Sequence, residues 1–185
     1  MARQRDIPSG RFVIRMQPGL HAALRETARA AATSLNDYCV RKLALPGVGR
    51  PEAAGVVLRA SVIAGARLAG LVVFGSSARG EAGETSDVDV LIVLDPEVPI
   101  TRELYRRWDT VPLRWDGREV EPHFARLPDP EARISGLWAE VAVDGVVLFE
   151  RELDLSCRLA RIRSRIVGGE VTRRWSNGRS YWVAA

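Results

Sequence analysis

The sequence predicts an α+β protein in two parts, an N-terminal strand–helix–helix segment and a mixed-sheet domain flanked by helices. An alternating run at residues 11–16, followed by two helix-forming stretches, predicts the first part. Two apolar runs, residues 71–74 and 88–94, predict buried strands of the second part. Residues 46–51 have linker composition, so we place the two domains at residues 1–48 and 52–185.

Charge is distributed unevenly along the 185 residues, although the net charge is only +4. Residues 1–50 carry nine Lys/Arg and three Asp/Glu (+6), residues 51–150 carry ten and seventeen (−7), and residues 151–185 carry eight and three (+5). An acidic middle suits a domain that holds cations. A basic N-terminal segment suits a polyanion such as DNA.

The two cysteines, Cys39 and Cys157, have no His or Cys neighbours at metal-ligand spacing. This argues against a disulfide scaffold and a zinc site and favours a reducing compartment. No apolar run approaches the ~18 residues of a membrane span. We therefore expect a soluble cytoplasmic protein that does not contact a membrane.

The N-terminal segment begins with a two-sided strand pattern. Phe12, Ile14 and Met16 fall on one face, and residues 11, 13 and 15 fall on the other. Residues 20–32 then have helix-forming composition. Ser34 is placed to cap a second helix over residues 35–43, with Asp37 three residues later as in a capping box.

One strand and two helices in about 40 residues cannot bury a core alone, so this segment predicts a homodimer. Residues 10–45 resemble the ribbon-helix-helix repressors of the Arc and MetJ type. The resemblance implies a two-stranded ribbon in the major groove of operator DNA, with Arg11, Val13 and Arg15 facing the bases. It also implies that Ser34, at the start of the second helix, holds a DNA phosphate. The alternative is a dimerisation arm that does not bind DNA.

The second domain is organised around a glycine turn and two aspartates. Gly75 and Ser76 follow an apolar strand, and glycine lets backbone N–H groups approach a polyphosphate closely. A helix beginning near Ser77 would add its positive end. Asp87 and Asp89 stand at positions i and i+2 of the next strand, so they project together and can bind hard cations. The alternative is that Asp87 caps a turn and Asp89 is a solvated strand end.

The residues Gly75-Ser76, a ten-residue spacer and Asp87-Val88-Asp89, with Ala78-Arg79-Gly80 and Ser86 between them, resemble a known signature. It is that of the nucleotidyltransferase superfamily to which DNA polymerase β belongs, in its minimal prokaryotic form. The resemblance implies two Mg²⁺ ions on the aspartates and transfer of a nucleoside monophosphate to an acceptor hydroxyl. It also implies a nucleotide site made by Gly75, Ser76, Ser77 and Arg79.

The superfamily uses a third carboxylate on a neighbouring strand, and residues 118–127 alternate as a strand would. Glu119, Glu121 and His123 share one face of it. We choose Glu121 as the third metal ligand and base, with Glu119 as the second choice. A glutamate on the solvent side of a strand is also ordinary, and His123 could assist, bind a phosphate or be purely structural.

The remaining stretches predict a helix over residues 131–143, a strand over residues 145–150 and a basic amphipathic helix over residues 153–167. The tail, residues 173–183, interleaves arginines and aromatics around Asn177-Gly178. It predicts a packed hairpin, with stacking on nucleic-acid bases as the alternative.

Together these features predict an enzyme that moves AMP from ATP, with Mg²⁺, to a hydroxyl of a protein partner such as a cognate toxin. The ribbon-helix-helix segment would bind the operator of a toxin–antitoxin-like operon. The alternative function is a transcriptional regulator whose transferase-like domain only binds nucleotide.

Overall fold

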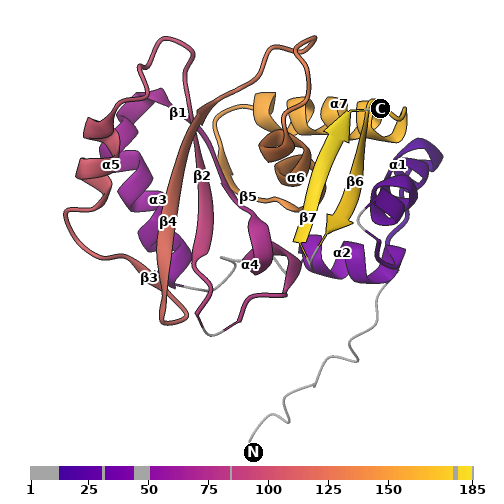
Figure 1. The fold of residues 1–185 in the computed structure, drawn as a ribbon, viewed down its shortest axis with the longest axis horizontal. Coiled ribbons are helices and arrows are strands. Elements are labelled where there is room, and N and C mark those ends of the chain that lie inside the picture. Colours follow the sequence, from indigo (N-terminus) through magenta and orange to yellow (C-terminus); the bar gives the residue numbers. More distant parts are fainter. Residues whose placement is uncertain (1–12, 31, 44–50, 84, 177–178, 185) are drawn as a thin grey trace, which may run out of the picture.

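The computed structural model of the chain describes residues 13–30, 32–43, 51–83, 85–176 and 179–184 (Figure 1). The helices are α1 (Pro18–Ala30), α2 (Leu35–Leu43), α3 (Pro51–Ala64), the 3₁₀ turn η1 (Gly65–Arg67), α4 (Gly75–Arg79), α5 (Arg102–Trp108), α6 (Gly136–Asp144) and α7 (Asp154–Val167). The strands are β1 (Leu68–Val73), β2 (Val88–Leu94), β3 (Arg114–Trp115), β4 (Arg118–Arg126), β5 (Val146–Glu150), β6 (Val171–Ser176) and β7 (Arg179–Ala184).

A five-stranded mixed sheet forms the centre, in the order β3-β4-β2-β1-β5. Strand β1 pairs antiparallel with β2 and β5, whereas β2 and β4 run parallel. A parallel pair needs a crossover, and the chain between β2 and β4 supplies it with α5. The predicted α+β class with a mixed sheet is confirmed.

Helices cover both faces of this sheet (Figure 1). Alternate residues of β2 point to opposite faces, so Val90 and Ile92 join the core under α3 and α5. Leu91 and Val93 join the core under α6 and α7. Because both faces are buried, β2 reads as a continuous apolar run, and only its beginning carries polar side chains.

The N-terminal helices pack against the rest of the chain, beside α7 (Figure 1). The Tyr38 hydroxyl of α2 is buried and donates a hydrogen bond to the Val143 carbonyl at 3.2 Å. The predicted cap of α2 is confirmed, since the Ser34 hydroxyl accepts from the Asp37 N–H at 3.0 Å and donates to the Asp37 carboxylate at 2.6 Å.

The predicted N-terminal strand is not found in the part that the structure describes. Residues 13–17 have no regular secondary structure, and Arg11 and Phe12 lie outside the described residues. Val13 is 90% exposed and Arg15 is also exposed. The physical reason is that a strand needs a neighbouring strand, and among the described residues none pairs with residues 13–17.

The predicted C-terminal hairpin is confirmed as β6–β7, a two-stranded antiparallel sheet separate from the central one. Element boundaries differ modestly elsewhere. Helix α6 begins only at Gly136, because Ser135 caps it by accepting from the Trp138 N–H. The two-residue strand β3, which pairs with β4 across a turn, was not predicted.

Among the described residues, no helix combines the length and the apolar character that a membrane crossing requires.

Candidate active site

The site begins where β1 turns into α4. Gly75 has a positive φ of +70°, which favours glycine, and is buried. A Cβ atom there would lie 2.4 Å from Oδ2 of Asp89. The backbone N–H of Phe74 also donates to the Asp89 carbonyl at 3.1 Å. Because glycine has no Cβ, the backbone of the turn can pack directly against the Asp89 carboxylate.

Replacing Gly75 with alanine is expected to reduce nucleotide transfer about a hundredfold, because the new methyl group must displace Asp89 from its position. Gly80 is a matched control, since its φ is +73° but a Cβ there meets nothing within 4 Å. Gly80→Ala carries the same strain of about 1–2 kcal/mol without the clash. Rates and melting temperatures of both variants check this, and equal losses of activity would contradict it.

The acids come together through the parallel pairing of β2 and β4. Asp89 lies opposite Glu121, and Leu91 lies opposite His123. One potential ligand atom from each of Asp89, Glu121 and His123 lies within 4.8 Å of the others. Carboxylate oxygens are the ligands that Mg²⁺ prefers, so Asp89 and Glu121 fit that ion, with His123 beside them.

His123 is held against Asp89. Its Nε2 lies 3.1 Å from Oδ1 of Asp89, and its ring meets Phe74 edge-on with 5.1 Å between centroids. The hydrogen bond to Asp89 raises the pKa of His123 above its ordinary value, against the opposing effect of burial. The imidazole thus hydrogen-bonds to Oδ1 of Asp89, while Oδ2 of the same carboxylate faces the Gly75 turn.

Asp87 precedes β2 and is exposed. It lines a cavity of about 360 Å³ together with Glu119, Glu121 and Asp109. The apolar part of the lining consists of Trp108, Val111, Pro112, Leu113, Val120 and Pro122. Among the described residues that line it, none is basic. The cavity is therefore an acidic space with an apolar wall, adjoining the acid cluster.

The predicted nucleotide-binding residues of α4 differ in their surroundings. The Ser76 hydroxyl makes no hydrogen bond within the described residues, whereas Ser77 donates to the Asp87 carbonyl at 3.2 Å. The Arg79 guanidinium donates to Glu81 and Glu140, at 2.6 Å each. A direct contact between Arg79 and a nucleotide stays a prediction.

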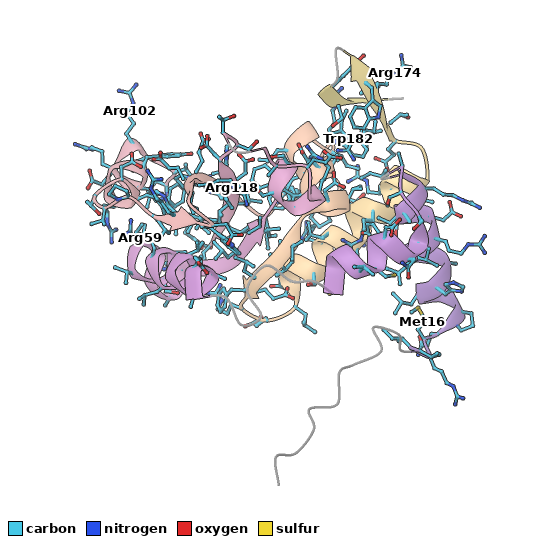
Figure 2. The ribbon with its side chains drawn as sticks, turned by 90° about the horizontal axis from the view of Figure 1, so that it is seen from below. Met16, Arg59, Arg102, Arg118, Arg174 and Trp182 are labelled. Atoms are coloured by element: carbon cyan, nitrogen blue, oxygen red, sulfur yellow. The ribbon has the colours of Figure 1, made fainter. Side chains whose placement is uncertain are left out.

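Some residues of the site were not found from the sequence. Arg118 donates to the Ser77 hydroxyl at 3.2 Å and so connects β4 to α4. Asp109 joins the acidic cavity from the loop after α5. Neither residue has a local sequence signal, because each lies near the site only in the folded chain. Figure 2 shows Met16, at the entry to α1, far from Arg118 of this site.

Residues 62–133, which include the turn and all the acids described above, match the family model of the nucleotidyltransferase domain. The matched family consists of enzymes that transfer nucleoside monophosphates. The predicted enzyme class, a nucleotidyltransferase, is confirmed. Residues 5–43 match the model of the HicB family.

Solved structures similar to this chain include a mutant of the toxin–antitoxin MntA-HpeT (14% identity, TM-score 0.43) and a toxin–antitoxin with AMP-PNP (15% identity, TM-score 0.42). Each alignment covers 60% of this chain and 85% of the other. A third is a candidate nucleotidyltransferase from Sulfolobus solfataricus (20% identity, TM-score 0.36), with 78% of this chain and 95% of that chain covered. A comparison with curated proteins gave no match.

Proposed function

We propose that this chain transfers AMP from ATP to a hydroxyl group, with Mg²⁺ bound by Asp87, Asp89 and Glu121. The observation that carries the proposal is the cluster of Asp89, Glu121 and His123 beside the Gly75 turn, inside a nucleotidyltransferase domain. Magnesium, when bound, offsets the negative charge of the triphosphate and of the departing pyrophosphate.

The chain's own residues supply the remaining steps. Gly75, Ser76 and Ser77 hold the phosphates, because the turn places a free hydroxyl and backbone groups beside Asp89. Glu121 takes the proton of the attacking hydroxyl, since it lies on the strand next to Asp89 and is exposed to an incoming acceptor. A site that only senses nucleotide has no need of this third acid, so its presence favours the enzyme.

The acidic cavity suits the acceptor. It adjoins the acid cluster, and Asp109 and Glu119 extend its negative charge beyond the residues that hold Mg²⁺. Polyanions are repelled by such a surface, whereas a hydroxyl on a protein segment can enter beside the apolar wall. A protein acceptor, such as a cognate toxin in a toxin–antitoxin-like operon, therefore fits better than a nucleic-acid end.

The direct test uses ATP labelled on its α-phosphate, Mg²⁺ and the product of each gene adjacent to this one. We expect label on one such protein, and its loss when EDTA removes the metal. Label from the γ-phosphate instead would mean phosphoryl transfer, and an absence of label from every acceptor with retained ATP binding would favour the nucleotide-sensing regulator.

We also propose that the N-terminal segment forms a ribbon-helix-helix dimer that binds operator DNA for autoregulation. Support comes from the sequence pattern, from the match of residues 5–43 to the HicB family and from exposed apolar groups at Val13 and Leu20. A second copy would provide the neighbour that a strand requires. Arg11, Val13 and Arg15 would then face the bases.

Replacing both Arg11 and Arg15 with alanine in the full chain is expected to weaken specific operator binding by several kcal/mol, since each base contact contributes about 1–3 kcal/mol. Nucleotide transfer should be unchanged, because Met16, next to Arg15, lies far from Arg118 of β4, the strand that carries Glu121 (Figure 2). Titration of promoter DNA at several salt concentrations measures the first effect. Normal promoter binding by the double variant would show that this segment does not read DNA.

A further inference from the structure

The buried carboxylate of Asp144, at the end of α6, is shared by two arginines. Its side chain is 1% exposed. Its Oδ2 lies 2.8 Å from Nη2 of Arg173, on the hairpin, and 3.8 Å from Nη1 of Arg79, on α4. An arginine of the β6–β7 hairpin and an arginine of α4, the helix that starts at Gly75, therefore both approach the same carboxylate oxygen of α6.

Arg173 is fixed in place by its surroundings. Its side chain is 5% exposed, and its guanidinium lies 5.4 Å and 5.5 Å from the ring centroids of Trp175 and Trp182. Figure 2 shows Trp182 at the base of the hairpin and Arg174 farther out. The approach to Asp144 does not have hydrogen-bond geometry, so the contact is an ion pair. A buried charge without its partner is strongly unfavourable, so Arg173 and Asp144 depend on each other.

Helix α4 depends on outside contacts in the same way. It has five residues, Gly75–Arg79, and a helix this short does not form by itself in water. Arg79, its last residue, contacts Glu140 and Asp144 of α6 in addition to Glu81. These ion pairs fix where α4 lies, and hence where the turn at Gly75 lies.

We propose that Arg173 and Asp144 are positioning residues for the nucleotide, acting through Arg79. The β6–β7 hairpin lies outside residues 62–133, the part that matches the nucleotidyltransferase model. It would nevertheless determine where the turn at Gly75 lies. Without Arg173, the buried Asp144 carboxylate keeps only Arg79 within ion-pair distance among the described residues. Arg79 must then shift toward Asp144 and away from Glu140, which moves α4. The consequence for the nucleotide rests on the proposed function; the coupling of hairpin and α4 does not.

The first arm of the test measures hydrogen exchange of the full chain without nucleotide. Arg173→Ala is expected to speed exchange of the amides of residues 76–81 by at least about tenfold, while those of β2 stay protected. Arg151→Ala is the matched control, because it breaks an Arg–Asp pair with Asp95 at the other end of β2. Unchanged exchange in α4 would overturn the proposal.

The second arm measures the affinity for a non-hydrolysable ATP analogue with Mg²⁺, and the KM and kcat of transfer. Arg173→Ala should raise the Kd and KM about tenfold and leave kcat within about twofold, with partial rescue in Arg173→Lys. A purely structural role would lower the amount of active protein and thus kcat, without raising KM. An unchanged Kd despite faster exchange would also overturn the proposal.

If Arg173→Ala fails to fold, Glu140→Gln serves instead, because it removes one of the two α6 carboxylates that hold Arg79, leaves Asp144 in place and does not change the hairpin. Slow exchange of α4 in that variant would overturn the proposal. Failure of the wild-type chain to bind the analogue would refute the proposed function, and the exchange arm would still decide whether the hairpin positions α4.

Discussion

Asp89→Asn is expected to abolish nucleotide transfer. The change removes a negative charge with almost no change in volume, at the residue that Gly75, His123 and Glu121 surround. Metal-assisted stabilisation of the transferred charge contributes several kcal/mol, and about 4 kcal/mol corresponds to a thousandfold in rate. Asp87→Asn should act in the same direction, since Asp87 borders the same acidic space.

Asp95→Asn is the control for this pair, because Asp95 follows the opposite end of β2 and pairs with Arg151. It should transfer nucleotide normally. Rates with labelled ATP measure the three variants, and circular dichroism verifies that each is folded. Full activity of Asp89→Asn would end the assignment of this cluster as catalytic.

The second large effect separates two glutamates of one strand. Glu121→Gln is expected to reduce turnover by about a hundredfold or more, since Glu121 pairs in register with Asp89 and belongs to the ligand cluster. Glu119→Gln should have a much smaller effect on turnover. Glu119 lines the neighbouring cavity but is not a member of that cluster.

Both variants should keep their melting temperatures, because both side chains are exposed. Steady-state kinetics at saturating ATP provide the comparison. The reverse order of effects would move the proton acceptor two residues along β4.

The sequence could predict the glycine turn and the two acidic strands because their signals are local. Apolar runs identify buried strands, and the position of Asp89 at a strand start follows from residue order alone. The pairing of β4 with β2 has no such signal. Only the parallel register places Glu121, and not Glu119, opposite Asp89.

Two further features depended on contacts that residue patterns do not encode. The family resemblance implies that Arg79 contacts the nucleotide, and this stays a prediction; its contacts with Glu140 and Asp144, more than 60 positions away in sequence, have no local signal. The alternation of residues 11–16 predicts an N-terminal strand. Such a pattern indicates which side chains share a face, but it does not identify the strand with which the segment would pair. Residues 13–17 show that alternation without a neighbouring strand does not produce one.

The parallel pairing of β2 and β4 has a consequence for how the protein folds. The two strands can align only after the chain between them, with α5, has closed its loop, and long-range pairings of this kind form slowly. The turn at Gly75 and the β1–β2 pair are closer in sequence, so they can form earlier. We therefore expect that, in a newly made chain, the turn at Gly75 forms before Glu121 reaches its place opposite Asp89.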